Sequence, residues 1–130
     1  MNLATIDIGT NTTLLLVART EPTPAAIEEQ AEITRLGRGI GRNGALDGDA
    51  IARTLAVLRR FADIARRHDA RIAAVGTEAL RRAPNADAFL GPAAEILGTP
   101  DSAAGSLQAN AAHASAGTSL LPLTRRPETV

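Results

Sequence analysis

The fold of this chain is decided by the stretch Ile6-Asp7-Ile8-Gly9-Thr10-Asn11-Thr12-Thr13. In it a short apolar run breaks into four small turn-forming residues, and a second apolar run then extends to Ala18. Two β-branched and aliphatic runs separated by such a turn are typical of a β-hairpin. We therefore expect residues 4–8 and 13–18 to form paired strands.

The turn of this hairpin has the chemistry of an anion site. Gly9 can take a positive φ and lets the backbone approach a ligand closely. The backbone N–H groups of Thr10, Asn11 and Thr12 can form a nest around an anion, and their side chains add further donors. The turn is a candidate phosphate site, although the same residues suit an ordinary Asx turn with Asn11 in its left-handed position.

Asp7 stands at the end of the first expected strand, where a carboxylate is costly to remove from water. Such a residue is explained if it binds a metal ion, orients a water molecule or caps the turn. The sequence leaves these three roles open.

Length and composition limit the classes of protein to consider. The chain has 130 residues, 14 acidic and 14 basic residues, and no cysteine. This is enough for one domain, and a net charge of zero gives no reason to expect nucleic acid or an anionic membrane as a partner. The lack of cysteine excludes disulfides and zinc–thiolate sites. No basic leader and no apolar run of membrane-spanning length is present, so we expect a cytoplasmic protein.

A third strand is expected over residues 26–36, with Ile33 and Leu36 facing inward. The charged residues of this stretch would equally lie on one helical turn, so a helix stays an alternative. These charged residues are Glu28, Glu29, Glu32 and Arg35.

The next segment, residues 37–44, is too rich in glycine for a helix or a strand. Its glycines spell G-x-G-x-x-G, and Asp63 follows about twenty residues later, as in dinucleotide-binding domains. In those domains the motif opens a helix directly after the first strand, whereas here Asp47 and Gly48 precede the next helix and Asp63 falls inside it. A dinucleotide-binding domain is therefore kept only as an alternative.

The clearest helix begins near Asp47 or Asp49, either of which can cap it, and it ends at His68, which we expect at the surface. Apolar residues recur along it at helical spacing and predict one buried stripe. The stripe consists of Ile51, Leu55, Leu58, Ala62 and Ala65.

A strand over residues 71–77 should follow, parallel to the first, since a helix connects them. Ligands of open α/β sheets collect beyond the carboxyl ends of such strands. Thr77 can cap the short helix 78–83 that comes next, and Arg81 in that helix is a candidate second contact for an anion. A further helix, residues 86–97, is expected to start at an Asn85 cap and to stop at Gly98 and Pro100. Its expected buried residues are Phe89, Leu90, Ala93, Ile96 and Leu97.

Three separated segments carry a resemblance to a known family. They are Asp7-Ile8-Gly9-Thr10-Asn11-Thr12, Thr34-Arg35-Leu36-Gly37-Arg38-Gly39, and the stretch from Val75-Gly76-Thr77-Glu78-Ala79-Leu80-Arg81 through Leu90. In this order and spacing they resemble the N-terminal portion of the Ppx/GppA family, the exopolyphosphatases and guanosine pentaphosphate phosphohydrolases of the actin-like ATPase superfamily. The resemblance covers residues 1 to about 100.

This resemblance implies an α/β fold of the actin-like, ribonuclease-H-like type, with a mixed sheet and helices, present here only in its N-terminal part. It also implies hydrolysis of terminal phosphoanhydride bonds with a divalent metal, usually Mg²⁺, acting on polyphosphate or guanosine pentaphosphate. The implied catalytic residues are Asp7, also the metal ligand, and Arg81. The implied phosphate-binding residues are Gly9, Thr10, Asn11, Thr12 and Thr77.

The chain departs from the family after residue 100. Relatives continue into a Glu-Glu-Ala-Arg stretch with the catalytic glutamate and into a second, Gly-Gly-Gly-Ser-Thr phosphate loop, and neither occurs here. Residues 101–130 are instead a tail of small residues that we expect to be disordered or weakly helical. A shifted reading frame near codon 100 explains this break, and a short paralogue is the alternative.

The chain by itself is therefore expected to be inactive, as a fragment of such a hydrolase. A non-catalytic module that binds phosphate or polyphosphate is the alternative function. Since relatives are often dimers and a half-sheet would be exposed, association into a homodimer is also considered.

Overall fold

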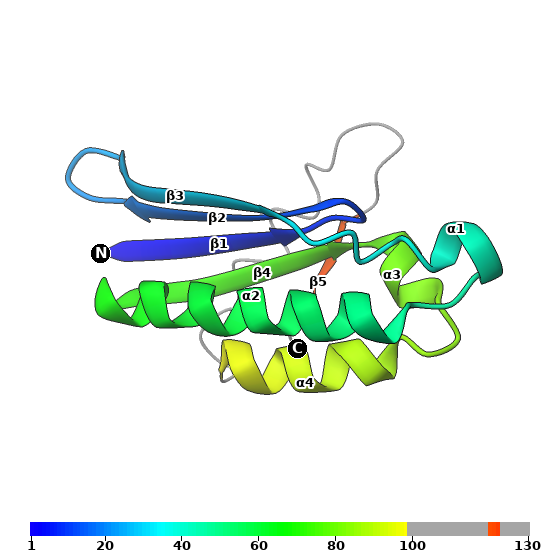
Figure 1. Cartoon of the computed structure of the whole chain (residues 1–130). Coiled ribbons are helices and arrows are strands. Elements are labelled where there is room, and N and C mark those ends of the chain that lie inside the picture. Colours follow the sequence, from blue (N-terminus) through cyan, green and yellow to red (C-terminus); the bar gives the residue numbers. More distant parts are fainter. Residues whose placement is uncertain (99–119, 123–130) are drawn as a thin grey trace, which may run out of the picture.

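The computed structural model describes residues 1–98 and 120–122, which form one mixed β-sheet with helices on one side (Figure 1). The strand order is β3-β2-β1-β4-β5, and β1 lies in the middle. The strands are β1 (Asn2–Ile8), β2 (Thr12–Arg19), β3 (Ala25–Ile33), β4 (Ala70–Thr77) and β5 (Leu120–Pro122). The helices are α1 (Ile40–Asn43), α2 (Gly48–Arg67), α3 (Glu78–Arg82) and α4 (Asp87–Leu97).

The predicted hairpin is confirmed, because β1 and β2 pair antiparallel from Asn2 opposite Arg19 to Ile8 opposite Thr13. The predicted parallel strand is confirmed as well, since β4 pairs parallel with β1. Along β1 the buried residues Ala4, Ile6 and Ile8 alternate with partly exposed ones. The buried set faces the helices, because successive side chains of a strand point to opposite faces.

Residues 25–33 form the third strand, so the helical alternative is wrong. Of the two residues expected to face inward, Leu36 is fully buried, although it follows the strand, whereas Ile33 is 64% exposed and its prediction is wrong. Ile33 pairs with Thr12 at the end of the β2–β3 ladder, on the face that no helix covers. Helices cover only one face of the sheet, and side chains alternate between the two faces along β3, so Ile33 points to the uncovered face.

The glycine-rich segment is not wholly irregular, since Ile40–Asn43 form the short helix α1, with Gly44 at φ 82° as its left-handed C-cap. This helix has four residues and is followed by a separate helix, α2. The motif thus follows an antiparallel edge strand, and it does not open a long helix after the first strand. That placement removes the structural context that a dinucleotide-binding turn requires.

Helix α2 provides most of the core. The predicted stripe is confirmed at four positions, while Ile51 is only partly buried. Phe61 was missed, and it is completely buried together with Phe89 of α4. Asp47 occupies the predicted N-cap position, but its side chain accepts no capping hydrogen bond there.

An ion pair and a hydrogen bond join β3 to α2 along the helix side of the sheet. Glu32 lies 2.9 Å from Arg60, and the imidazole of His68 lies 2.9 Å from the Glu28 carboxylate. His68 was expected only as a surface residue at the helix end. Its side chain is instead about one-third exposed and holds the strand to the helix terminus.

Helix α4 packs beside α2, and both lie on the same side of the sheet (Figure 1). Its predicted buried face is confirmed at Phe89, Ala93 and Leu97, whereas Leu90 and Ile96 are partly buried. Asn85 does not cap this helix. Its side-chain amide instead accepts from the backbone N–H of Leu46 and donates to the carbonyl of Leu46, at 2.8 and 2.9 Å.

The other face of the sheet carries no helix among the described residues, and apolar side chains lie exposed on it. Leu14 is 44% and Leu16 is 36% exposed. None of the described helices is both long and apolar enough to cross a membrane. Of the expected disordered tail, residues 120–122 form β5 beside β4, and the remainder lies outside the described residues.

We expect Phe61→Ala to lower the free energy of unfolding by about 3–5 kcal/mol, because it leaves a cavity at the centre of the core. Urea unfolding followed by far-UV circular dichroism measures this change. Arg59→Ala, on the exposed side of the same helix, is the matched control and should change stability by no more than about 0.5 kcal/mol. Equal losses for the two variants would contradict the central role of Phe61.

A second prediction concerns pH. Hydrogen bonds from His68 and Gln30 lower the pKa of Glu28 below its ordinary 4.5. The charged carboxylate is thus favoured by folding, so its stabilisation is complete above pH 4.5 and is lost as the pH falls through the lowered pKa. We expect the stability difference between the wild type and Glu28→Gln to shrink from about pH 6 to about pH 3 in urea titrations.

Glu29→Gln is the control for the contact between Glu28 and His68, and it should show no such dependence on pH. Glu29 is exposed and forms no ion pair in the described part of the chain. A difference between wild type and Glu28→Gln that stays constant over the whole pH range would show that the contact does not depend on charge.

Candidate phosphate site at one edge of the sheet

The candidate site lies where β1 and β4 end side by side. The two strands are parallel, with Asp7 opposite Val75 and Ile8 opposite Gly76. The turn after β1, residues 9–12, therefore adjoins Thr77 at the end of β4. The structure brings together two segments that are 65 or more positions apart in the sequence, as the expected chain order requires.

The turn after β1 is tight and leaves two amides free. The N–H of Gly9 donates to the carbonyl of Thr12 at 3.0 Å, which closes the turn. Within residues 1–98 no backbone hydrogen bond uses the N–H of Thr10 or of Asn11. Thr10 and Asn11 are exposed, and the Asn11 amide makes only a long, 3.5 Å contact to the Thr12 hydroxyl. Donors for an anion are thus available in the predicted place.

The backbone conformation of this turn differs from expectation. Neither Gly9 nor Asn11 has a positive φ, and among the non-glycine residues described only Arg35 and Asp69 do, both at 51°. Gly9 instead permits a close approach of the chain, since a Cβ there would lie 3.0 Å from the carbonyl oxygen of Thr12, closer than most Cβ contacts. The left-handed role assigned to Asn11 in the alternative Asx turn is therefore wrong.

A second segment, residues 34–37, binds the carbonyl groups of this turn by hydrogen bonds. The carbonyl of Asn11 accepts from the N–H groups of Thr34 and Arg35, at 3.0 and 2.9 Å. The carbonyl of Thr10 accepts from the N–H of Gly37 at 2.8 Å. We refer to residues 34–37 as the strap. The strap has no predicted role from its sequence, because no local pattern indicates which carbonyls its N–H groups meet.

Asp7 lies on the helix-free face of the sheet, between Leu14 of β2 and Val75 of β4. Its carboxylate makes no hydrogen bond or ion pair with any described residue, so it does not cap the turn. Desolvation raises the pKa of Asp7 above its ordinary 3.8. Of the three roles left open by the sequence, binding a metal and orienting water remain.

Asp7 also lines a shallow cavity of about 370 Å³ on that face, together with Thr5, Leu14, Leu16 and Glu29. Glu29 was not predicted to approach Asp7. The signal that could have found it is the two-residue strand period, which puts both carboxylates on one face once the register is known.

Thr77 occupies the N-cap position of α3, but its side chain forms no capping hydrogen bond, so the predicted cap is wrong. Its hydroxyl oxygen is buried and has no hydrogen-bond partner. A buried hydroxyl without a partner costs about 1–3 kcal/mol. By strand alternation the side chain shares a face with Asp7, two residues farther along the ladder.

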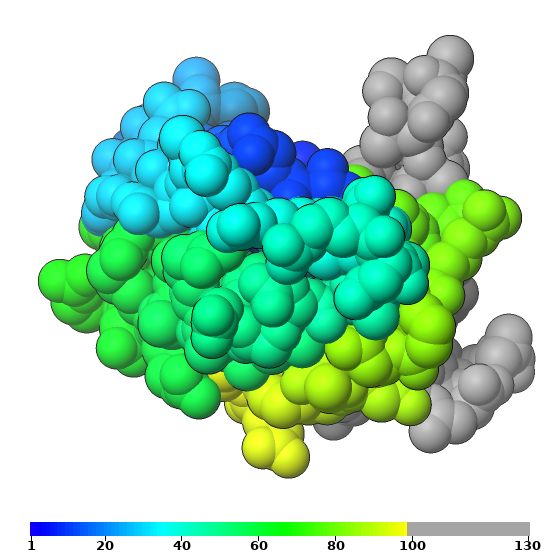
Figure 2. All heavy atoms as spheres, turned by 45° about the vertical axis from the view of Figure 1, so that its right-hand side comes forward, coloured from blue at the N-terminus to red at the C-terminus, as the bar shows by residue number. Residues whose placement is uncertain are grey.

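Arg81 lies one helical turn beyond Thr77 on α3 and is exposed. The neighbouring Arg82 is turned to Glu78, 3.4 Å away. Figure 2 shows this end of the molecule, where the N-terminal hairpin in dark blue borders the cyan segment around α1. The structure thus gathers the turn, the strap, Thr77 and α3 at one end of the sheet.

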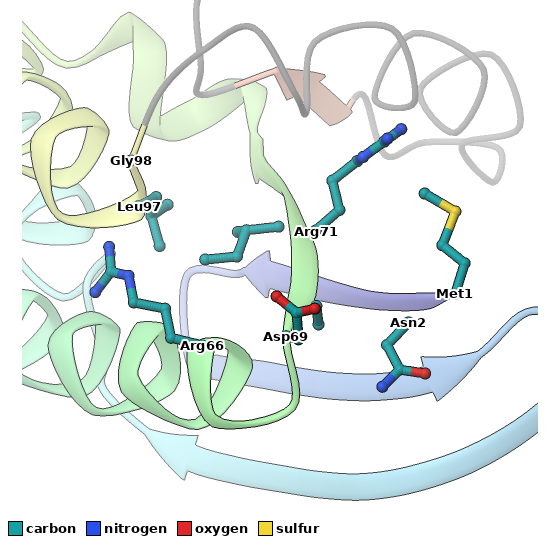
Figure 3. A pocket seen from close by; sticks show the side chains of 9 residues that line it. Met1, Asn2, Arg66, Asp69, Arg71, Leu97 and Gly98 are labelled. Carbon is teal, nitrogen blue, oxygen red and sulfur yellow. The ribbon is translucent and has the colours of Figure 1, made fainter.

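The larger described cavity, about 430 Å³, is elsewhere (Figure 3). It is lined by residues at the starts of β1 and β4 and at the ends of α2 and α4, among them Asn2, Arg66, Asp69 and Leu97. It therefore lies at the opposite end of the strands from the candidate site.

In the described part of the chain no group of three or more His, Asp or Glu side chains is arranged to hold a metal ion.

We expect Asp7→Asn to raise the thermal unfolding midpoint at about pH 7. A raised pKa means that folding disfavours the charged form, so the cost is present at neutral pH and disappears below pH 3.8, where the carboxyl is protonated in both states. The gain should accordingly vanish at about pH 3 in calorimetric scans. Asp49→Asn, at an exposed position in the first turn of α2, is the control and should give no gain. A lower midpoint for Asp7→Asn at neutral pH would contradict the desolvation argument.

Comparison with known proteins matches this chain to one family of phosphatases. The family model described as the Ppx/GppA phosphatase family matches residues 16–103, a range that includes the strap, Thr77 and Arg81 and begins after the turn. The chain is 36% identical over 110 residues to exopolyphosphatase 2 of Mycobacterium tuberculosis, covering 78% of this chain and 34% of that protein. It is 38% identical over 104 residues to a guanosine-5'-triphosphate,3'-diphosphate pyrophosphatase of Vibrio vulnificus, covering 75% of this chain and 20% of that protein.

Among solved structures, the Ppx/GppA phosphatase of Aquifex aeolicus superimposes with a TM-score of 0.70 at 33% identity. The superposition covers 75% of this chain and 33% of that one, so the chain spans about a third of the length of this relative. The predicted fold, the N-terminal part of an actin-like domain with a mixed sheet, is confirmed by this match. The chain belongs to the Ppx/GppA phosphatase family.

Proposed function

We propose that this chain forms the first phosphate-binding half of a site that hydrolyses terminal phosphoanhydride bonds. The observation that carries the proposal is the buried, unpartnered hydroxyl of Thr77 next to a turn with two unused amides. An isolated polar atom of this kind destabilises the free protein, and a phosphate oxygen would satisfy it. The names of the relatives, an exopolyphosphatase and a guanosine pentaphosphate-type pyrophosphatase, support polyphosphate or guanosine pentaphosphate as the ligand.

In this proposal the residues divide the work by position. The unused N–H groups of Thr10 and Asn11 and the hydroxyls of Thr10, Thr12 and Thr77 bind phosphate oxygens, while Gly9 lets the backbone of the turn approach them. Arg81, one turn farther, stabilises the negative charge that shifts toward the leaving oxygen. Asp7 orients the attacking water or holds a cation, and its helix-free face leaves it open to both.

The donor set fits a divalent ion of the Mg²⁺ type. Mg²⁺ commonly keeps several waters and binds through one or two carboxylates together with substrate phosphates. Asp7 is a half-buried carboxylate without a partner, and Glu29 lines the same cavity. When bound, such an ion would neutralise phosphate charge and polarise the phosphoryl group.

The proposal includes binding without turnover by this chain alone. Its 130 residues contain no Glu-Glu-Ala-Arg stretch and no second glycine-rich Ser-Thr loop. The absence of these stretches favours, as a second candidate function, a non-catalytic module that binds phosphate. A cytoplasmic location and pairing into a homodimer are further parts of the proposal.

The test is calorimetric titration of the full chain with tripolyphosphate in the presence of Mg²⁺. We expect saturable binding, and we expect Thr77→Val to weaken it by roughly tenfold or more, since it removes one hydrogen bond to a charged ligand without changing the side-chain shape. Thr23→Val, at an exposed position in the β2–β3 loop, is the matched control and should bind as the wild type does.

Phosphate release is measured in the same samples. The proposal of binding without turnover predicts none from tripolyphosphate or long-chain polyphosphate. Absence of binding by the wild type would overturn the phosphate site, and release that is lost in Asp7→Ala would overturn the claim that the half-site is inactive.

A further inference from the structure

We infer that Gly37 is a positioning residue for the phosphate turn, because its lack of a side chain lets the strap bind the back of that turn. This inference deepens the proposed function and rests on it where ligand binding is concerned. Gly37 itself touches no proposed ligand group. It acts through Thr10 and Asn11, whose carbonyls the strap holds.

The strap fixes the direction of the amides in the turn. Its three hydrogen bonds end on two consecutive carbonyls, those of Thr10 and Asn11, at 2.8 to 3.0 Å. In a planar trans peptide the C=O and the following N–H point in opposite directions. Holding the carbonyl of Thr10 toward the strap therefore turns the N–H of Asn11 away from it, and the carbonyl of Asn11 does the same for the N–H of Thr12.

The strap is itself anchored, so it cannot easily retreat from the turn. The hydroxyls of Thr34 and Thr13 are both buried and lie 2.8 Å apart. Arg53 of α2 donates to the carbonyl of Thr34 at 2.9 Å, and Leu36 is fully buried. Arg35 keeps a φ of 51° within this segment. A non-glycine residue holds that conformation only where the surroundings determine it strongly.

A side chain at Gly37 would meet the turn directly. A Cβ built there lies 2.6 Å from the Cβ of Thr10 and 2.9 Å from its Cγ2. The Cβ of Thr10 is fixed to the backbone, so no change of rotamer relieves the contact. Either the turn or the strap must move, and the anchors of the strap direct the movement into the turn. By contrast, a Cβ at Gly41, four residues on, has no heavy atom within 4 Å.

The experiment compares Gly37→Ala with Gly41→Ala in the full chain. The first readout is the backbone amide spectrum by NMR, without ligand. We expect Gly37→Ala to shift the amide signals of Asn11 and Thr12 and to leave the core signals of α2 in place. Gly41→Ala should leave the turn unchanged. Unshifted signals of Asn11 and Thr12 in folded Gly37→Ala would overturn the inference, whatever the ligand results are.

The second readout is affinity for tripolyphosphate with Mg²⁺. We expect Gly37→Ala to weaken binding by roughly tenfold or more, as for the loss of a hydrogen bond to a charged group, and Gly41→Ala to have no effect. If the wild type does not bind, the proposed function fails while the amide spectrum still decides the role of Gly37. Equal binding by wild type and Gly37→Ala would overturn the inference alone.

A compensating variant separates the contact from general damage. Thr10→Gly removes both atoms that a Cβ at position 37 would meet most closely, leaving the Cα at 3.2 Å. In the Thr10→Gly background, adding Gly37→Ala should therefore cost much less affinity and shift the amides less than it does in the wild type. An unchanged effect of Gly37→Ala in that background would show that the two residues do not act through each other. If Gly37→Ala fails to fold, folding restored by Thr10→Gly supports the inference, and failure in both backgrounds overturns it.

Discussion

The central strand β1 carries the constraint on which the rest of the structure depends. Every second residue, Ala4, Ile6 and Ile8, is buried against the helices, while the residues between them face the helix-free side. Because the side-chain period of a strand is two, this burial fixes the register toward both neighbours. It thereby fixes which residues end beside one another at the site, Gly9 and Thr77 above all.

The same alternation places two polar groups of the site where they destabilise the folded chain. Asp7 is placed on a half-buried surface where desolvation raises its pKa, and the hydroxyl of Thr77 is buried without a partner. Neither arrangement stabilises the free chain. Residues of this kind are expected where a ligand supplies the interactions that folding leaves unsatisfied.

The helix-free face of the sheet is apolar at its surface. The chain spans about a third of the Aquifex aeolicus phosphatase, and it exposes Leu14, Leu16 and Ile33 on one side of its sheet. Apolar patches on a sheet commonly mark contact surfaces. Within the described residues the site is likewise one-sided, with donors and a carboxylate on one edge and no second set opposite them.

The sequence by itself determined the hairpin around Gly9, the amphipathic helix ending near His68 and the parallel strand ending at Thr77, because each has a local period or turn signal. The motifs around Asp7, Thr34 and Thr77 also indicated the family. Only the tertiary structure decided that Ile33 faces outward, that Asn85 holds Leu46, that Thr77 caps nothing, and that the strap holds Thr10 and Asn11. These features depend on which distant groups meet across the fold, and contacts between residues 21 to 39 positions apart leave no periodic trace in the chain.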